Sequence, residues 1–371
     1  MSSFCILKGM VMVTYNFSAG PGVLPTPVIS QIKADLAQNE FTHLSILEIS
    51  HRSAQFEKIM ASAQQRLRDL MSIPDEYGVV FVQGGGSLQF EMLPLNLATN
   101  KQSIAVLDSG NFAAKAAQAA QMLGKEVTIV GSSKSQHYRY LPQLTGDFDA
   151  NAYDYLHITT NNTIEGTTYH QDMLPQTTGR LTADMSSNIL AEPYDITQFD
   201  AVFAGAQKNL GPAGVTLAIV KKDCLASQSI EHVGPMMRYQ NYLDKDSMYN
   251  TPPVFSIYAL DLVLSWVQAE GGVDEMTRRN QLKAAKLYDF LDESRLFEAP
   301  VKTSDRSLTN IVFTTNDAKR DAQIVAQAKE NGLFNLGGHR SVGGFRASLY
   351  NAQPMAAVDA LIEFLNKVEK G

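Results

Sequence analysis

Short apolar runs alternate with longer amphipathic stretches along the first two thirds of this chain. Residues 78–82 (GVVFV) form a clear apolar run, followed by three glycines and an amphipathic stretch from Ser87 to about Ala98. The run at 103–107 and the alanine-rich stretch at 111–123 repeat this unit. Such runs are typical of buried strands, whereas the amphipathic stretches are long enough for helices. The alternation predicts an α/β fold with a mostly parallel sheet flanked by helices. Further strands are predicted at 127–130, 155–160, 180–185, 200–204 and 215–220.

The pattern changes after the segment NTPP at 250–253. A long helical pattern follows, and another runs from 276 to 291. The tail predicts a strand, a helix, a strand and a helix, which together are typical of a compact α+β unit. Their ranges are 310–315, 322–331, 345–350 and 354–370. We therefore expect three parts, which are an N-terminal extension (1–15), a large domain (16–265) and a small C-terminal domain (266–371).

Composition narrows the class of protein. The 371 residues are 44% hydrophobic and 19% charged, as in an ordinary globular enzyme. The formal net charge of -7 disfavours nucleic-acid binding, which needs a basic surface. The first 13 residues are too short for a signal peptide, and no apolar run approaches the roughly 20 residues that span a bilayer. The two cysteines, Cys5 and Cys224, have no paired spacing, so we expect no disulfide framework, no metal site and a cytoplasmic location.

The segment AGAQKNLGPAG at 204–214 contains the most informative residue, Lys208. The segment joins two predicted strands, and its small residues leave room for a bulky group beside the lysine. Partial burial there would lower the pKa of the amine, and a neutral amine can form a Schiff base with a cofactor aldehyde. Taken alone, the segment leaves open an ordinary surface lysine in a turn.

A glycine loop at 84–86 precedes a predicted helix. Its backbone N–H groups and the positive end of the helix would form a cradle for a phosphate. The loop is not a nucleotide P-loop, because no Gly-Lys-Ser/Thr follows it. The alternative is a tight turn in which Ser87 caps the helix.

Asp184 lies near the end of a predicted strand, at the carboxyl edge of the sheet where ligands of open α/β folds bind. A carboxylate there can keep a heteroaromatic nitrogen protonated, although Asp184 taken alone favours a turn-capping or helix-capping role. A phosphate cradle, a strand-end acid and a loop lysine are the three anchors that pyridoxal 5′-phosphate (PLP) requires. Together they favour PLP as the cofactor.

Distinctive segments from Asn16 onward cover nearly the whole chain. They are NFSAGPGVLP, ISHRS, QGGGSLQF, TNNTIEG, TADMSSNIL, AGAQKNLGPAG, MYNTPP and GGHRSVGGFRASLYNA. In these segments the chain resembles the class V, fold-type I, PLP-dependent aminotransferases. The resemblance implies a large domain with a mostly parallel seven-stranded sheet flanked by helices, and a smaller α+β C-terminal domain.

The resemblance also implies cofactor roles. Lys208 matches the Schiff-base lysine, and Asp184 matches the partner of the pyridine nitrogen. Phe112 matches the aromatic residue that stacks on the ring, where the family often has tryptophan; phenylalanine keeps the π-face with less contact area. The other implied contacts in the same subunit are Gly86, Ser87, Thr163 and Gln207.

Asn250 and Thr251 match residues that reach the cofactor phosphate from a partner subunit, so the resemblance implies a homodimer with shared active sites. Some members carry an arginine, a further contact to substrate phosphate, where this chain has Ser87. That contact is absent here.

Five basic residues match the substrate site of the family. Arg346 matches the residue that binds the substrate α-carboxylate, His339 and Arg340 match the phosphate-binding pair, and His51 and Arg52 match the group that handles the distal anion. Arginine suits both carboxylate and phosphate because its planar group binds two oxygens at once. Any one of these residues, taken alone, is equally consistent with a surface ion pair.

The resemblance implies transfer of the amino group of L-glutamate to a phosphorylated 2-oxo acid, 3-phosphohydroxypyruvate, which gives O-phospho-L-serine and 2-oxoglutarate. Related members also form a phosphorylated threonine analogue, 4-phosphohydroxy-L-threonine, for pyridoxine synthesis. Two alternatives stay open: a serine–pyruvate or alanine–glyoxylate type of class V aminotransferase, and a non-catalytic nucleotide-binding protein.

Overall fold

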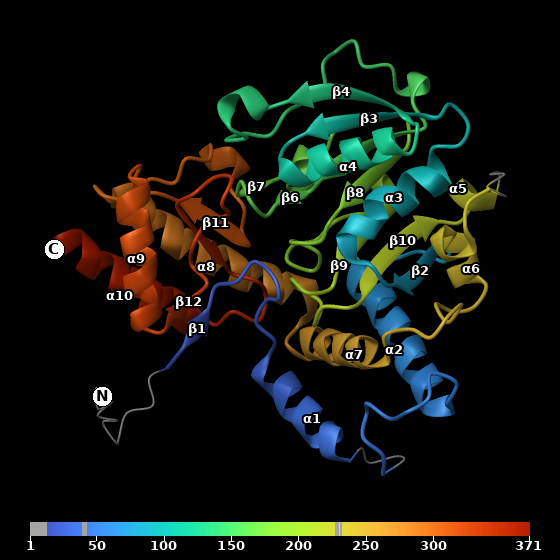
Figure 1. Ribbon diagram of the computed structural model, residues 1–371, viewed down its shortest axis with the longest axis horizontal. Coiled ribbons are helices and arrows are strands. Elements are labelled where there is room, and N and C mark those ends of the chain that lie inside the picture. Colours follow the sequence, from blue (N-terminus) through green and yellow to red (C-terminus); the bar gives the residue numbers. More distant parts are fainter. Residues whose placement is uncertain (1–12, 39–42, 227–229, 231) are drawn as a thin grey trace, which may run out of the picture.

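A seven-stranded sheet forms the centre of the computed structural model, which describes residues 13–38, 43–226, 230 and 232–371 (Figure 1). Strand β10 is antiparallel to both of its neighbours, β2 and β9, and the remaining pairs are parallel. This confirms the predicted mostly parallel sheet of seven strands. In spatial order the strands are β2 (Tyr77–Val82), β10 (Thr216–Lys221), β9 (Ala201–Gly205), β8 (Leu181–Asp184), β5 (Tyr155–Thr159), β3 (Ser103–Asp108) and β4 (Glu126–Ser132).

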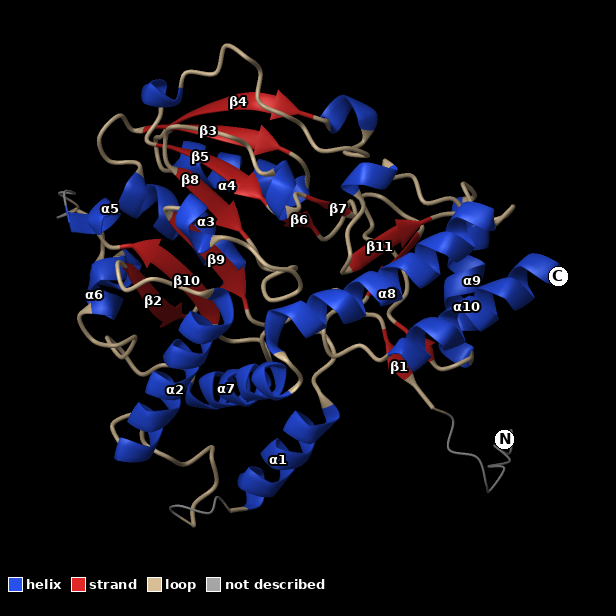
Figure 2. Ribbon diagram, turned by 180° about the vertical axis from the view of Figure 1, so that it is seen from behind, coloured by secondary structure: helices blue, strands red, loops and turns tan. Residues whose placement is uncertain are grey.

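Helices cover both faces of this sheet, because successive strand side chains point to opposite sides (Figure 2). Val79 and Phe81 of β2 belong to one hydrophobic cluster, whereas Val80 and Val82 belong to the other. The first cluster includes residues of α1 (Thr26–Ala37), α2 (Ala54–Met71) and α7 (Val254–Ala269), and the second includes residues of α3 (Gly85–Leu97), α4 (Asn111–Met122), α5 (Asp223–Ala226) and α6 (Tyr239–Leu243).

The C-terminal part builds a third hydrophobic cluster beside the sheet (Figure 1). The expected order of strand, helix, strand and helix is confirmed, but helix α9 begins four residues before the predicted start, because the Asp317 side chain caps it by accepting from the N–H groups of Lys319 and Arg320. The elements are α8 (Gly272–Glu293), β11 (Asn310–Phe313), α9 (Ala318–Glu330), β12 (Leu333–Phe334), β13 (Phe345–Ser348) and α10 (Met355–Lys370).

The first described residues pack against this C-terminal part. Strand β1 (Tyr15–Asn16) pairs in parallel with β12, and Phe17 is buried in the third cluster. Neither two-residue strand has a pattern that the sequence analysis detects. The proposed domain limits stay a prediction, and residues 1–12 of the expected extension, with Cys5, lie outside the described residues.

A two-stranded hairpin, β6 (Asn161–Asn162) with β7 (Thr167–Thr168), projects beyond the end of β5. Its turn carries Thr163 and Glu165, two residues of the candidate site. Short 3₁₀ helices lie at 134–136, 150–152, 171–173, 196–198, 235–237 and 303–305. Within the described ranges, no helix is both long and apolar enough to cross a membrane.

Candidate active site

Lys208 lies in the loop between the antiparallel strands β9 and β10, at the edge of the sheet where β8 and β5 end. Its half-buried side chain donates a hydrogen bond from Nζ to Thr163 Oγ1 at 2.7 Å. The same nitrogen lies 5.0 Å from the centroid of the Phe112 ring, at the start of α4. The fold therefore brings three of the predicted cofactor residues together from three distant segments.

The charge state of this amine is set by burial and by two neighbouring charges. Burial lowers the pKa of Lys208 to about 8; the Asp184 carboxylate raises this pKa, and the Arg346 guanidinium lowers it. About a tenth of the amine is therefore neutral at pH 7, far more than for an ordinary lysine, and the neutral form is the one that acts as a nucleophile or proton acceptor.

A hydrogen-bonded chain holds Thr163 in place. Thr163 Oγ1 donates to Ser187 Oγ at 2.9 Å, and Ser187 Oγ in turn donates to the backbone oxygen of Asn161 at 2.9 Å. The Asn161 amide donates to Ser187 Oγ at 2.6 Å. Sequence reasoning missed Ser187 and Asn161, although both lie within motifs that carried the family resemblance.

Asp184 is the last residue of β8 and is 6% exposed. One carboxylate oxygen accepts the backbone N–H of Ser186 at 2.9 Å, so the turn-capping contact is present, and it holds the side chain at the predicted carboxyl edge of the sheet. The Asp184 charge raises the pKa of Lys208, as a nearby carboxylate does for an amine.

The predicted phosphate cradle is formed by the start of α3. Gly84 has φ +92° and Gly85 has φ +68°, values that favour glycine, and no side chain caps the helix. The alternative in which Ser87 caps the helix is wrong: the left-handed Gly84 lets the helix begin at Gly85, so Ser87 is its third residue and is exposed. Without a cap, the first N–H groups of α3 stay available to an anion.

Ser186 lies beside this cradle, and Gln207 lies in the lysine loop next to Lys208. A Cβ atom added at Gly86 would lie 3.4 Å from Ser186 Oγ, and that hydroxyl accepts the N–H of Gly205 at 3.1 Å. The half-buried Gln207 is the neighbour of Lys208, and its backbone oxygen accepts the N–H of Gly22 at 2.7 Å. The cradle, the lowered-pKa amine and the strand-end carboxylate fit the three anchors of PLP.

Among the basic residues of the C-terminal part, Arg346 is close enough for its charge to act on Lys208. Arg346 on β13 has a long contact of 3.5 Å from Nη1 to the Thr163 oxygen, and its buried Nε has no hydrogen-bond partner among the described residues. Burial lowers the pKa of Arg346 below its usual range. Burial and the charges of Arg346, Arg340 and Lys115 lower the pKa of the half-buried His339. A cationic region therefore faces the start of α4.

The other four predicted residues form a separate group. His51, Arg52, Asn250 and Thr251 line one hollow of about 600 Å³. Asn250 donates to the side-chain oxygen of Gln83 at 3.1 Å, and Gln83 donates to the Thr251 oxygen at 3.2 Å. No hydrogen bond or ion pair found within the described part of the chain joins this group to Lys208.

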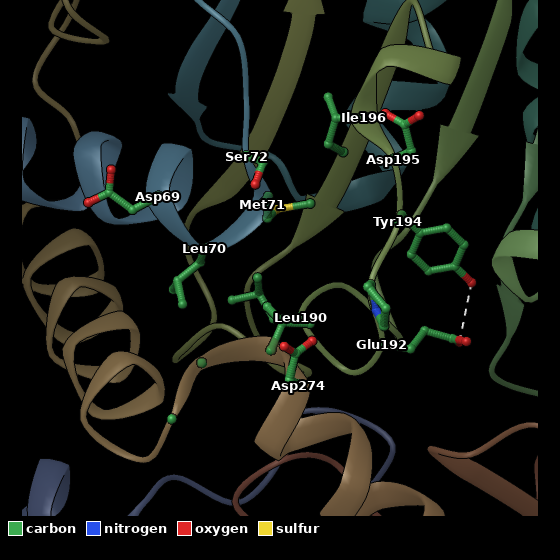
Figure 3. A pocket seen from close by; sticks show the side chains of 14 residues that line it. Asp69, Leu70, Met71, Ser72, Leu190, Glu192, Tyr194, Asp195, Ile196 and Asp274 are labelled. Atoms are coloured by element: carbon green, nitrogen blue, oxygen red, sulfur yellow. Dashed lines mark hydrogen bonds between the residues drawn. The ribbon is translucent and has the colours of Figure 1, made fainter.

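A further hollow, of about 530 Å³, contains none of the predicted site residues (Figure 3). Its lining includes the carboxylates of Asp69, Glu192, Asp195 and Asp274. The Tyr194 hydroxyl donates a hydrogen bond to Glu192 Oε1 at 3.2 Å. Figure 3 marks this contact with a dashed line. Negative charge of this kind disfavours an anionic substrate. No group of side chains in the described part of the chain is arranged to hold a metal ion.

Comparison with known proteins decides between the possible families. The model of the aminotransferase class-V family matches residues 14–361. The chain belongs to the class-V aminotransferases. This confirms the resemblance predicted from the sequence and, with it, a PLP-dependent aminotransferase as the class of enzyme.

Similar class-V aminotransferases include several named phosphoserine aminotransferases. The one from Leuconostoc mesenteroides subsp. mesenteroides is 71% identical over 358 residues, which cover 96% of this chain and 99% of the relative. A phosphoserine aminotransferase structure solved in a study of radiation damage to its Schiff base has 42% identity and a TM-score of 0.93, covering 97% of this chain and 99% of that one. The structure from Bacillus circulans subsp. alkalophilus has 38% identity and a TM-score of 0.91, covering 96% and 99%.

Proposed function

We propose that this class-V aminotransferase is a phosphoserine aminotransferase. It transfers the amino group of L-glutamate to 3-phosphohydroxypyruvate and produces 2-oxoglutarate and O-phospho-L-serine, a step of serine biosynthesis. The observation that carries the proposal is the setting of Lys208: it donates a hydrogen bond to Thr163 Oγ1 at 2.7 Å, and the charges of the acidic Asp184 and the basic Arg346 both act on it. The acidic neighbour Asp184 suits the protonated ring nitrogen of a cofactor, and the basic neighbour Arg346 suits an anionic substrate.

The cofactor side has a group for each part of PLP. The start of α3 with Gly86, Ser87 and Gln207 would hold the phosphate, and the Phe112 ring would cover the pyridine face. When bound, PLP supplies an aldehyde that combines with amines and a ring that withdraws electrons from the amino-acid α-carbon.

The chain's own groups then handle the protons. Lys208 Nζ accepts the proton from the α-carbon and later returns it, a role that its lowered pKa suits. Asp184 would keep the ring nitrogen of bound PLP protonated, and Thr163 Oγ1 orients the lysine through its hydrogen bond.

Basic residues on the substrate side bind the two anionic groups of the oxo acid, its carboxylate and its phosphate. Arg346 binds the α-carboxylate, and His339 with Arg340 binds the phosphate of the oxo acid. His51 and Arg52 handle the distal anion. These local cations allow a chain of net charge -7 to bind a doubly negative substrate.

A homodimer is part of the proposal. The group of His51, Arg52, Asn250 and Thr251 has no described contact with Lys208 of its own chain, although the family pattern assigns Asn250 and Thr251 to the cofactor phosphate. Assembly of two subunits would bring this group to the neighbouring active site. A cytoplasmic location is also proposed, since the buried Cys224 is a free thiol.

One assay tests the reaction. Glutamate-dependent amination of 3-phosphohydroxypyruvate is measured beside that of pyruvate, glyoxylate and the phosphorylated 2-oxo precursor of 4-phosphohydroxy-L-threonine. We expect the two phosphorylated acceptors to be preferred. Faster turnover of pyruvate or glyoxylate would refute the substrate assignment and leave the class of enzyme intact.

The cofactor anchor is tested by absorbance. The purified protein should be yellow, and Lys208→Ala should lose the covalent visible band, while Lys319→Ala, on the exposed surface of α9, keeps it. A wild-type protein that takes up no added PLP would overturn the assignment of these anchors.

A further inference from the structure

Glu165 is a buried carboxylate in the turn between β6 and β7, only 6% exposed. Its Oε1 accepts the backbone N–H of Asn111, the first residue of α4, at 2.9 Å. Its Oε2 is buried and has no hydrogen-bond partner among the described residues. A Cβ atom added at Gly110 would lie 2.7 Å from Oε2, so the absence of a side chain at Gly110 lets the carboxylate pack against the start of α4.

The carboxylate therefore touches the helix that carries Phe112. An acceptor at the first turn of a helix satisfies an N–H group that has no intrahelical partner, and a negative charge there is favourable. Phe112 directly follows Asn111, and its ring lies 5.0 Å from Lys208 Nζ. A shift of Glu165 would move the start of α4 and this ring with it.

The same carboxylate acts on Arg346. Arg346 Nη1 lies 3.5 Å from the backbone oxygen of Thr163, which is in the same turn as Glu165. Glu165 raises the pKa of Arg346 and Arg346 lowers that of Glu165, yet no ion pair within 4.0 Å joins them in the described part of the chain. Arg346 Nε is likewise buried without a partner. The charge of Glu165 thus acts on the Arg346 guanidinium without forming an ion pair with it. The Nε–H group of Arg346 therefore remains available to another anion.

Other charges surround Glu165. Asp108, at the end of β3, raises the pKa of Glu165; it also accepts the hydroxyl of Tyr138 at 3.1 Å. Lys134, His137 and Arg139 line the same hollow as Glu165, about 520 Å³ in volume. Burial is the largest influence and raises the pKa of Glu165 to about 7.

We propose that Glu165 is a positioning residue for both halves of the active site: it anchors the start of α4, the helix that carries Phe112, and its charge sets how strongly Arg346 attracts the substrate carboxylate. This inference rests on the proposed function, since it takes Arg346 as the carboxylate-binding group. When Glu165 is ionised, its negative charge weakens the attraction of Arg346 for the substrate carboxylate. When Glu165 is neutral, that attraction acts in full on the substrate. Affinity for a dicarboxylate therefore falls as the pH rises through about 7.

Two variants separate the two roles. Glu165→Gln keeps an oxygen that can accept from Asn111 and removes the charge. Glu165→Asp keeps the charge and withdraws the oxygen from Asn111 by one methylene. Binding of glutarate, which has two carboxylates and no amino group to react, is measured by calorimetry on the PLP-loaded proteins between pH 6.5 and 8.5.

For the wild type, we expect the Kd of glutarate to rise by about fivefold over this range beyond any rise seen in Glu165→Gln. Glu165→Asp should keep the dependence on pH but bind PLP about fivefold more weakly, because the hydrogen bond to Asn111 is lost. A residue that only stabilises the fold would leave the two glutarate curves parallel.

Parallel curves for the wild type and Glu165→Gln would overturn the charge role, and unchanged PLP affinity in Glu165→Asp would overturn the anchoring role. Each variant is measured by its own experiment. If one variant fails to fold, the other still tests the role assigned to it. If either of these negative results is found while 3-phosphohydroxypyruvate is turned over normally, only the proposed role of Glu165 is refuted. A wild type that binds no PLP would instead refute the proposed cofactor anchors.

Discussion

Lys208 Nζ donates a 2.7 Å hydrogen bond to Thr163 Oγ1, and this contact joins the loop after β9 to the turn after β6. The Thr163 hydroxyl donates its own hydrogen bond to Ser187 Oγ at 2.9 Å, so its oxygen is left to accept from the lysine. The amine is therefore held in one orientation before any cofactor binds.

Removing this acceptor should slow the uptake of PLP. Thr163→Val preserves the shape of the side chain but cannot accept from Lys208, and loss of about 1 kcal/mol of hydrogen bonding corresponds to about a fivefold effect. The rate of PLP uptake is measured by adding PLP to the apo protein and following the appearance of the visible absorbance band. Thr163→Ser, which keeps the hydroxyl, is the control and should match the wild type; equal rates for Val and Ser would contradict the orienting role.

The pH dependence of PLP uptake should report the charges around Lys208. The neutral amine reacts, so the rate should rise with pH through a midpoint of about 8. Asp184 raises this pKa, so Asp184→Asn should move the midpoint down. Arg346 lowers it, so Arg346→Met should move the midpoint up. Shifts of about one unit are expected.

The opposite signs make this pair of variants its own control. A general loss of packing would disturb both proteins in a similar way, whereas the two charges must act in opposite directions. Midpoints that move together, or not at all, would show that these charges do not govern the amine.

An arginine at position 87 should strengthen recognition of phosphate. Ser87 is exposed on the first turn of α3, where a longer cation can approach a bound phosphorylated substrate. Ser87→Arg should lower the KM for 3-phosphohydroxypyruvate by about fivefold, with the KM for glutamate unchanged. Ser87→Gln, of similar length without charge, should resemble the wild type. An equal change for both substrates would point to a distorted cradle.

The buried Lys283 should make stability depend on pH. Its amine is 2% exposed and donates to the oxygens of Leu349 and Tyr350 at 2.9 and 2.7 Å, and burial lowers its pKa to about 7. The unfolded chain, with a lysine pKa of about 10.4, holds this proton more tightly, so the free energy of unfolding should rise with pH from about 7 to about 10.

Urea unfolding at pH 7 and pH 9 measures this contribution. The stability advantage of the wild type over Lys283→Met should be greater at pH 9 than at pH 7 by about 2 kcal/mol. Lys286→Met, at an exposed position on the same helix, should show no such change. A constant difference between wild type and Lys283→Met would mean that the buried amine keeps its ordinary pKa.

Much of the architecture follows from local pattern. The central strands, the start of α4 and the two C-terminal helices are recognisable because a run of apolar residues or a helical period lies within a few neighbouring positions. The glycine loop and the lysine loop are recognisable for the same reason, since small residues mark a place where the backbone must turn or leave room. Lys208, Asp184 and the glycine cradle could therefore be predicted from the sequence.

The tertiary structure decided the features that depend on residues far apart in the chain. Strands β1 and β12 are two residues long and gain their order only by pairing with each other. Glu165 is an ordinary polar residue in the sequence, and its importance comes from its closeness to Asn111 and its electrostatic coupling to Arg346. The separation of the Asn250 group from Lys208 is likewise invisible in a list of motifs. Burial and neighbouring charge set the pKa of each group, and both are properties of the folded chain.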